Sequence, residues 1–403
     1  MKILAAFLSL VLLASAHAQR VSPLAERPKW SELEKYQESI TREDFLYLLD
    51  EVYAPGGAWK PFIEASATSA TIQTGGKARP FVLRFASKNE AIKPAARFWR
   101  QKTQMPPRPS NKPLQGIRIA IDPGHIGGQW AQMEERWFRI GDSKPVTEGN
   151  MTLYVAKLLV PRLKALGAQV SLTRNKPAPV TSLRPEKLAD EARTSLEADG
   201  DRITTSAVHT EAERLFYRVG EIHQRAELVN GKLKPDLVLC LHFNAEAWGN
   251  ASHPTLTDVN HLHLLVTGAF SGKELAYEDQ RFNMLDKLLS RAYPEELAIS
   301  NAVAASMSKA TGLPPYVYHG GNAVKVGSNP YVWGRNLLAN RLFQCPVVYV
   351  EPYVMNNREV FARLQAADYD GKRLFGGKLK ESIYREYADG IVRGLVDYYT
   401  NPR

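Results

Sequence analysis

The sequence predicts an α/β fold: a mostly parallel mixed sheet of about six strands between helices, preceded by a small α+β N-terminal domain. Three observations support this prediction. From Gly116 onward, short apolar runs alternate with longer amphipathic stretches, which is the pattern of strands joined by helical crossovers. The apolar runs are nearly continuous, as in strands covered on both faces. Before Gly116 the pattern differs, and four prolines within residues 105–116 separate the two parts.

Residues 1–18 are typical of a secretory signal peptide. Lys2 gives a charged start, an apolar stretch runs from Ile3 to Leu13, and Ala16-His17-Ala18 provides a small-residue cleavage site. We therefore expect an exported protein, periplasmic or secreted. No other stretch approaches the roughly 18 consecutive apolar residues of a spanning helix, so no transmembrane segment is predicted.

The expected domain boundaries follow the Pro-rich stretch. Residues 19–112 are predicted to form an N-terminal α+β domain that includes the linker, and residues 113–403 a larger α/β domain. The sequence does not indicate what the N-terminal domain does.

Within the N-terminal domain, a helix is expected after Thr41, which lies three residues before Asp44 and precedes apolar residues at helical spacing. Residues 69–74 and 79–87 are predicted as strands, and residues 90–101 as a helix.

In the larger α/β domain, the apolar runs predict strands and the amphipathic stretches predict helices. The expected strands are residues 117–122, 168–174, 236–243, 262–268 and 346–352, and the expected helices are residues 151–167, 211–229, 298–312 and 381–399.

The formal net charge is +10, which suits an anionic partner such as a cell wall or a membrane surface. Nucleic acid is not favoured, because no dense Lys/Arg run is interleaved with aromatic residues. The two cysteines, Cys240 and Cys345, lie near opposite ends of their strands, so we expect both to be free if the strands are parallel neighbours.

Three predicted strands end in side chains that bind metals or transfer protons: His125, His242 and Glu351. Glu148 opens the helix that follows the first of these strands. Carboxyl ends of parallel strands meet at one edge of a sheet, where functional groups gather. Two imidazoles and a carboxylate suit zinc, and a second carboxylate suits proton transfer in hydrolysis.

Each residue alone has an ordinary structural explanation. A histidine at a strand end is commonly a satisfied turn residue, Glu148 would favour the positive end of its helix, and Glu351 could pair with a base. The four together at one predicted edge favour a site.

Four segments in succession resemble the zinc-dependent N-acetylmuramoyl-L-alanine amidases of the amidase-3 family: IAIDPGHIGG, then the stretch from TEGN to SLTR, then PDLVLCLHFNA, then PVVYVEPYVMNN. The resemblance extends over residues 115–400. It implies that His125, Glu148 and His242 bind Zn²⁺ and that Glu351 is the general acid/base. It also implies hydrolysis of the amide between N-acetylmuramic acid and L-alanine in peptidoglycan.

The sequence departs from the family pattern in the interval between His125 and Glu148, which is long and contains Glu134 and Glu135 as rival carboxylates. We prefer Glu148 because it immediately precedes the expected helix.

Residues 175–212 and 246–297 are long for connections, and long connections are commonly lids or binding loops. Residues 181–205 are highly charged, so we expect them to lie outside the core.

Other histidines leave alternatives open. His261 and His263 are two residues apart on a predicted strand and therefore share a face, as a chelating pair would. His319 lies in a Gly-rich turn and could line the pocket.

Two other functions remain open at this point: a zinc hydrolase of another amide or peptide, and a wall-binding protein with an inactive zinc site. The expected partner is peptidoglycan or a muropeptide, and a regulatory protein could bind the N-terminal domain or the insertions.

Overall fold

The computed structural model describes residues 20–76 and 78–401. The predicted signal peptide lies outside these residues. Among the described helices, none is both long enough and apolar enough to cross a membrane.

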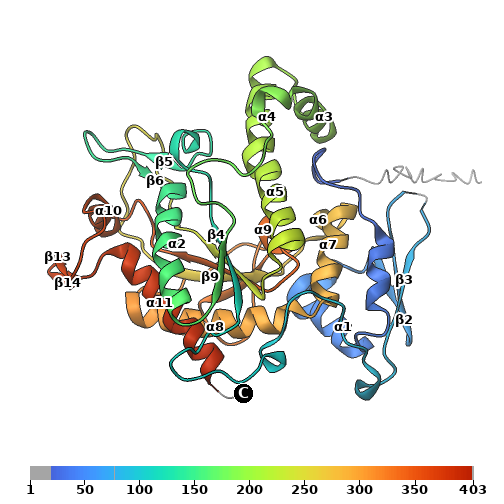
Figure 1. Cartoon of the computed structure of the whole chain (residues 1–403). Coiled ribbons are helices and arrows are strands. Elements are labelled where there is room, and N and C mark those ends of the chain that lie inside the picture. Colours follow the sequence, from blue (N-terminus) through green and yellow to red (C-terminus); the bar gives the residue numbers. More distant parts are fainter. Residues whose placement is uncertain (1–19, 77, 402–403) are drawn as a thin grey trace, which may run out of the picture.

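A seven-stranded sheet forms the centre of the molecule, with helices on both faces (Figure 1), which confirms the predicted fold class. The strand order is β10-β11-β9-β12-β8-β4-β7. In chain order the strands are β4 (Arg118–Pro123), β7 (Gln169–Leu172), β8 (Leu237–Leu241), β9 (Leu262–Thr267), β10 (Val324–Lys325), β11 (Val332–Arg335) and β12 (Val347–Pro352). The sequence did not predict β10 and β11.

Strand direction divides the sheet into two parts. Strands β7, β4, β8 and β12 are parallel, so their carboxyl ends lie at one edge. Strand β9 runs antiparallel to β12, with His263 paired with Glu351. The beginning of β9 therefore lies at the same edge as the end of β12.

The two faces of the sheet are covered by different helices. Helices α2 (Glu148–Ala165), α8 (Ala292–Thr311) and α11 (Ile383–Thr400) share a core with one face, and α5 (Glu221–Glu227) packs on the other. In β4, Ile119 and Ile121 belong to the first core and Ala120 to the second, because successive side chains alternate across a strand.

A long helical stretch extends beyond the edge of the sheet at which the parallel strands end (Figure 1). It begins with α4 (Thr205–Arg214) and continues through a π-helical segment (Leu215–Gly220) into α5, and α3 (Ala189–Asp199) packs against α4.

The inner face of this helix pair is buried. Leu188, Ala192 and Leu196 join Phe216 and Ile126 in a separate small core. The expectation that residues 181–205 lie outside a core is therefore wrong for this face, because apolar residues at helical spacing outweigh the charged composition.

Most of the second insertion is also structural. It contains β9, α6 (Gly272–Leu275) and α7 (Glu278–Leu289), and nearly all of α7 is buried. These elements cannot be a lid, because β9 is a strand of the central sheet and α7 is a buried helix.

The N-terminal unit consists of α1 (Arg42–Leu48) and a small antiparallel sheet of β1 (Ile63–Ala65), β2 (Ser69–Ile72) and β3 (Phe81–Arg84). The predicted cap is present, since the Thr41 side chain accepts a hydrogen bond from Asp44 N. The helix expected at residues 90–101 is absent apart from a short 3₁₀ turn (Asn89–Ala91). Pro94 accounts for this, because proline lacks an N–H and disfavours helix in the preceding residue.

The N-terminal unit packs against α7. Tyr36 donates a hydrogen bond to Asp286 at 2.9 Å, and Arg281 donates to the carbonyl of Gln73 at 2.8 Å. The unit also shares the main hydrophobic core with the central sheet and its helices.

The remaining elements are short. They are α9 (Leu338–Leu342), α10 (Arg358–Gln365), and the paired strands β5 (Trp137–Phe138) with β6 (Val146–Thr147) and β13 (Arg373–Phe375) with β14 (Lys378–Lys380). Cys240 and Cys345 are both free, as predicted, and both are buried.

Candidate active site

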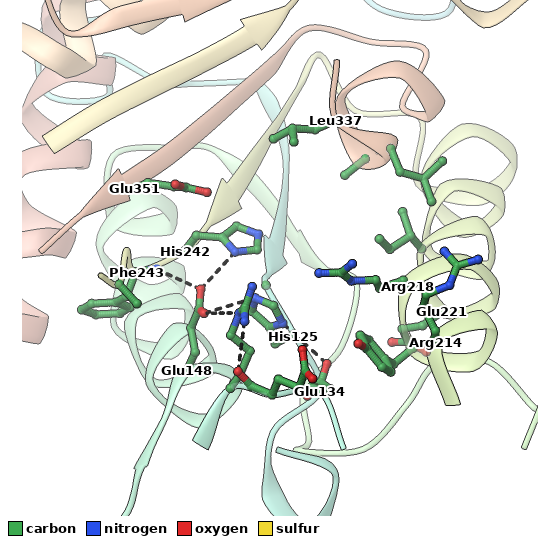
Figure 2. A pocket seen from close by; sticks show the side chains of 18 of the residues that line it. His125, Glu134, Glu148, Arg214, Arg218, Glu221, His242, Phe243, Leu337 and Glu351 are labelled. Atoms are coloured by element: carbon green, nitrogen blue, oxygen red, sulfur yellow. Dashed lines mark hydrogen bonds and ion pairs between the residues drawn. The ribbon is translucent and has the colours of Figure 1, made fainter. Parts of the chain in front are cut away.

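A cavity of about 1220 Å³ opens at the edge where the parallel strands end. His125, Glu148, His242 and Glu351 all line it, and Figure 2 shows them on one side, with Arg214, Arg218 and Glu221 of the long helical stretch opposite.

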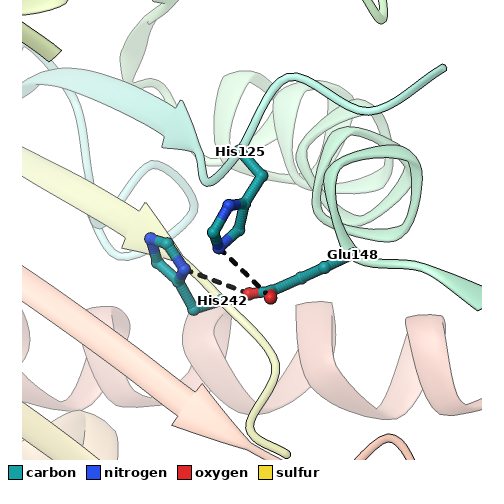
Figure 3. Close-up of side chains that lie close together, drawn as sticks. All are labelled: His125, Glu148 and His242. Atoms are coloured by element: carbon teal, nitrogen blue, oxygen red, sulfur yellow. Dashed lines mark hydrogen bonds and ion pairs between the residues drawn. The ribbon is translucent and has the colours of Figure 1, made fainter. Parts of the chain in front are cut away.

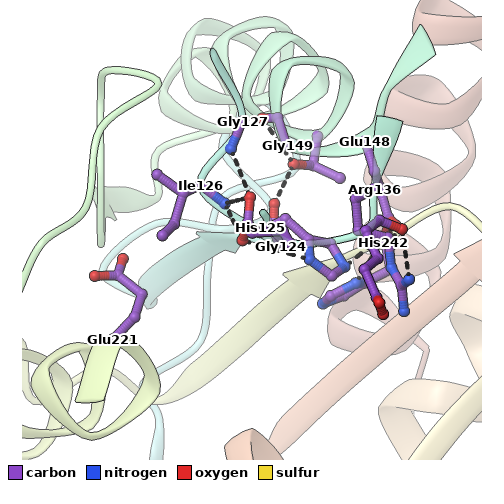
Figure 4. A network of polar contacts seen from close by, with 12 residues as sticks. Gly124, His125, Ile126, Gly127, Arg136, Glu148, Gly149, Glu221 and His242 are labelled. Atoms are coloured by element: carbon purple, nitrogen blue, oxygen red, sulfur yellow. Dashed lines mark hydrogen bonds and ion pairs between the residues drawn. The ribbon is translucent and has the colours of Figure 1, made fainter. Parts of the chain in front are cut away.

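His125 follows the end of β4 and has a positive φ of 59°, a conformation that few non-glycine residues adopt. The buried Glu134 holds the loop there, because its carboxylate accepts hydrogen bonds from Ile126 N and Gly127 N at 2.8 and 3.0 Å. Figure 4 labels Ile126 and Gly127 in the loop beside His125. Arg225 of α5 donates to the carbonyls of Pro123 and His125, both at 2.9 Å. The ring of His125 is thus positioned by contacts on both sides of its loop.

Glu148 is the first residue of α2 and is only 2% exposed. The long interval that precedes it forms the β5–β6 ribbon, which places Arg136 Nε 3.3 Å from Glu148 Oε2. Glu148 Oε1 accepts a hydrogen bond from Phe243 N at 3.0 Å. The carboxylate is therefore fixed by the neighbouring strand ends.

His242 immediately follows β8 and stacks on Tyr349 of β12, with ring centroids 4.4 Å apart and planes 11° apart. On the other side the ring lies against Gly124. These contacts hold the imidazole in one orientation.

Figure 3 shows how the three side chains converge. His125 Nε2 lies 3.2 Å from Glu148 Oε2, and His242 Nδ1 lies 3.1 Å from Glu148 Oε1. One donor atom from each residue lies within 4.8 Å of the others, and this is the single such group of three found within the described part of the chain.

The cluster favours positive charge. Burial acts to lower the pKa of His125, but the carboxylates of Glu148 and Glu134 raise this pKa to about 9. Burial acts to raise the pKa of Glu148, but the two histidines hold it well below its usual value. An ionised carboxylate and two imidazoles together are a donor set suited to a divalent cation.

Glu351, near the end of β12, lies outside this cluster. Its Oε2 is 2.8 Å from His263 Nε2. Burial acts to raise the pKa of Glu351, but His263 and His242 lower it below the usual value, so the carboxylate is ionised.

The rival residues are placed differently. Glu134 lies 3.7 Å from His125 Nδ1 and is engaged by backbone N–H groups, while Glu135 is exposed. His261 and His263 lie near each other, with ring centroids 5.8 Å apart. Neither belongs to a group of three potential metal-binding side chains among the described residues. His319 is exposed and is not among the described residues lining the cavity.

The insertions contribute unequally to the cavity. Residues 246–249, 251 and 252 line it, together with Val21 and Ser22 from the N-terminal segment, whereas none of residues 175–212 does. Buried residues of the first insertion instead pack with Ile126, which follows His125 in the chain.

Sequence reasoning missed the residues that hold the site in place: Arg136, Arg225, Tyr349 and the role of Glu134. The register between β9 and β12, which pairs His263 with Glu351, was also missed. No local signal identifies these contacts, because each joins residues that are distant in sequence or lie on an irregular loop.

This fold, with histidines and carboxylates at the carboxyl edge of its sheet, provides the groups of a hydrolytic site. The chain belongs to the N-acetylmuramoyl-L-alanine amidase family Amidase_3, whose family model matches residues 119–376. No curated protein matches the chain.

Similar solved structures are also amidases. Ami1 from Mycobacterium abscessus is 17% identical, with 70% of this chain and 99% of that chain covered and a TM-score of 0.38. AmiC2 of Nostoc punctiforme is 16% identical, with 71% and 99% covered and a TM-score of 0.39. CwlD from Clostridioides difficile, in complex with the GerS lipoprotein, is 14% identical, with 70% and 96% covered and a TM-score of 0.39.

Proposed function

We propose that this protein is a zinc-dependent cell-wall hydrolase that cleaves the amide between N-acetylmuramic acid and L-alanine in peptidoglycan. The observation that carries the proposal is the convergence of His125, Glu148 and His242 beside Glu351, in a chain of the amidase family.

The residues present fit zinc. Two imidazole nitrogens and a buried carboxylate are a donor set that leaves room for substrate in a tetrahedral catalytic site. Glu134 beside His125 and Tyr349 beside His242 are the kind of outer contacts that orient metal-binding histidines. Bound zinc would supply Lewis-acid chemistry, polarising the amide carbonyl and lowering the pKa of water.

The remaining chemistry belongs to Glu351. As an ionised carboxylate outside the donor cluster, it accepts the proton of the attacking water and then donates that proton to the departing alanine nitrogen. The C–N bond breaks as the C–O bond forms, and Glu351 returns to its ionised form. The substrate carbonyl must therefore bind between Glu351 and the His/Glu/His cluster, within the cavity.

The proposal includes export to the periplasm or the outside of the cell, on the basis of residues 1–18. A net charge of +10 suits the anionic wall as the surface on which the protein works. Residues 246–249, 251 and 252, which line the cavity, are the part of the insertions that we expect to contact substrate.

Digestion of purified sacculi tests the proposal. Mature protein loaded with zinc should release free stem peptides with new L-alanine amino termini, measured by mass spectrometry. Glu351→Gln should keep its zinc and lose about 10²–10⁴-fold in rate, because the amide preserves shape and removes the base. Glu359→Gln, which changes an exposed carboxylate on α10, should retain full activity.

The alternatives give different products. New amino termini other than L-alanine would identify a hydrolase of another amide. Binding to sacculi with zinc present and no bond cleaved would identify a wall-binding protein.

A further inference from the structure

His263 and Glu351 are partners in the sheet. The antiparallel register of β9 and β12 places them opposite each other, and the imidazole Nε2 lies 2.8 Å from Glu351 Oε2. His263 is 1% exposed and Glu351 lines the cavity, so the contact is shielded from water on the histidine side. On sequence grounds alone, this histidine had no expected role beyond a chelating pair with His261.

The surrounding contacts define which nitrogen of His263 carries the proton. Asn244 Oδ1 accepts a hydrogen bond from Ala245 N at 2.7 Å, so the amide nitrogen of Asn244 faces His263 Nδ1, at 3.5 Å. An NH₂ group faces an acceptor, because two donors repel. The neutral ring therefore carries its proton on Nε2, the nitrogen that faces Glu351.

Other polar groups lie around this pair. Tyr318 Oη lies 3.2 Å from His263 Nε2 and accepts a hydrogen bond from Arg335 at 3.3 Å. Several charged or titratable groups surround Glu351: His261, His263 on β9, Tyr318, Arg335 on β11, His242 after β8, Tyr349 on β12, Tyr387 on α11 and Glu148 on α2. Among these, His263 is the group in hydrogen-bond contact with the Glu351 carboxylate.

We propose that His263 is a positioning residue for the general acid/base: its Nε2–H donates to Glu351 Oε2, which fixes the carboxylate and leaves Oε1 to exchange the proton with water and the leaving amine. This inference rests on the proposed function of Glu351. His263 keeps its own proton throughout, so no additional proton acceptor is needed. The arrangement corresponds to a base oriented by a third group.

Two substitutions at one position separate orientation from packing. In His263→Gln the side-chain amide nitrogen can reach the place of Nε2, whereas in His263→Asn it reaches only that of Nδ1. We expect the Asn variant to lose about 10- to 100-fold in kcat with zinc content and KM unchanged. The Gln variant should recover most of this loss. His209→Asn, which changes an exposed histidine on α4 away from the cavity, is the control and should retain the wild-type rate.

The pH profile gives a second readout. Removing the N–H donor raises the pKa of Glu351, because the ionised form loses a hydrogen bond. The acidic limb of kcat should therefore move to higher pH in His263→Asn and stay near its wild-type position in His263→Gln. In a Glu351→Gln background, His263→Asn should cause no further loss.

The outcomes are distinguishable. Equal damage in the Gln and Asn variants, or a wild-type rate and pH profile in the Asn variant, would overturn the role of His263 while leaving the proposed function intact. Full activity of Glu351→Gln would instead overturn the role of Glu351.

Should the Asn variant fail to fold, the wild-type protein still provides a test. Ring ¹⁵N chemical shifts of zinc-loaded protein should show His263 protonated on Nε2 and not on Nδ1. A proton on Nδ1 would contradict the inference.

Discussion

Gly124 lies against the imidazole of His242 so closely that a β-carbon at residue 124 would be 2.3 Å from the ring carbon Cε1. Its φ lies outside the range that disfavours other residues, so the close contact alone requires glycine.

Gly124→Ala should therefore displace the His242 ring and weaken metal binding. We expect zinc content after dialysis and kcat/KM both to fall at least about tenfold, and overpacking to lower the free energy of unfolding by about 1–3 kcal/mol. Metal analysis and denaturant unfolding measure these changes. Gly231→Ala, where a β-carbon meets nothing within 4 Å, is the control. Full zinc retention in Gly124→Ala would show that the ring tolerates displacement.

Glu134 and Glu135 are adjacent glutamates with different expected roles. Glu134 holds the backbone of Ile126 and Gly127, so Glu134→Gln should release the His125 loop and lower zinc affinity about 10- to 100-fold. Glu135→Gln changes an exposed side chain and should have no effect on affinity. Competition with a chromogenic chelator measures both. Equal affinities in the two variants would mean that Glu134 does not position the metal site.

Removal of zinc should affect stability as well as activity. Metal that binds only the folded state stabilises it, so dialysis against a chelator should lower Tm and abolish turnover, and added zinc should restore both. His125→Ala and His242→Ala should show no zinc-dependent rise in Tm. A full rise in both variants would place the metal elsewhere.

The small core of the first insertion predicts a further stability effect. Leu188 is 2% exposed and packs with the residues beside Ile126. Leu188→Ala should lower the free energy of unfolding by about 2–5 kcal/mol, measured by urea denaturation. Lys187→Ala, which truncates the exposed neighbour, should change it by less than about 0.5 kcal/mol. Similar values for the two variants would show that the insertion does not contribute to the folded core.

Asp236 connects the N-terminal unit to the sheet and makes stability depend on pH. Burial acts to raise the pKa of Asp236, but hydrogen bonds from Arg100 and Arg118, at 2.6 and 2.7 Å, lower it below the usual value. Because the folded state favours the ionised form, this stabilisation is complete above the unfolded pKa of about 3.9 and is lost as pH falls below it.

Asp236→Asn should therefore lower the free energy of unfolding by about 2–3 kcal/mol at pH 7. The difference from wild type should shrink as pH falls from 4 to 2. Urea denaturation across this range measures it. A difference that is constant with pH would assign the effect to packing and not to charge.

The sequence predicted most of the helices and strands because their apolar residues recur at local periods. The apolar runs around residues 119, 239 and 348 located the strands, and His125, His242 and Glu351 were identified because each ends or follows one of them. Glu148 was identified because it begins a helix. The helix predicted at residues 90–101 was wrong, although a local signal against it was available: Pro94 lies within this range and disfavours a helix.

Tertiary structure alone decided how distant segments meet. Periodicity carries no information about strand direction, so nothing local indicated that β9 runs antiparallel to β12 and brings His263 to Glu351. The burial of Leu188 and Leu196, the hydrogen bonds of Glu134 and the contact between Gly124 and His242 were likewise settled by non-local packing. The sequence by itself predicted the residues that we propose supply the chemistry, because they follow elements that local periodicity identifies. The fold determined what positions them, because those partners lie far away along the chain.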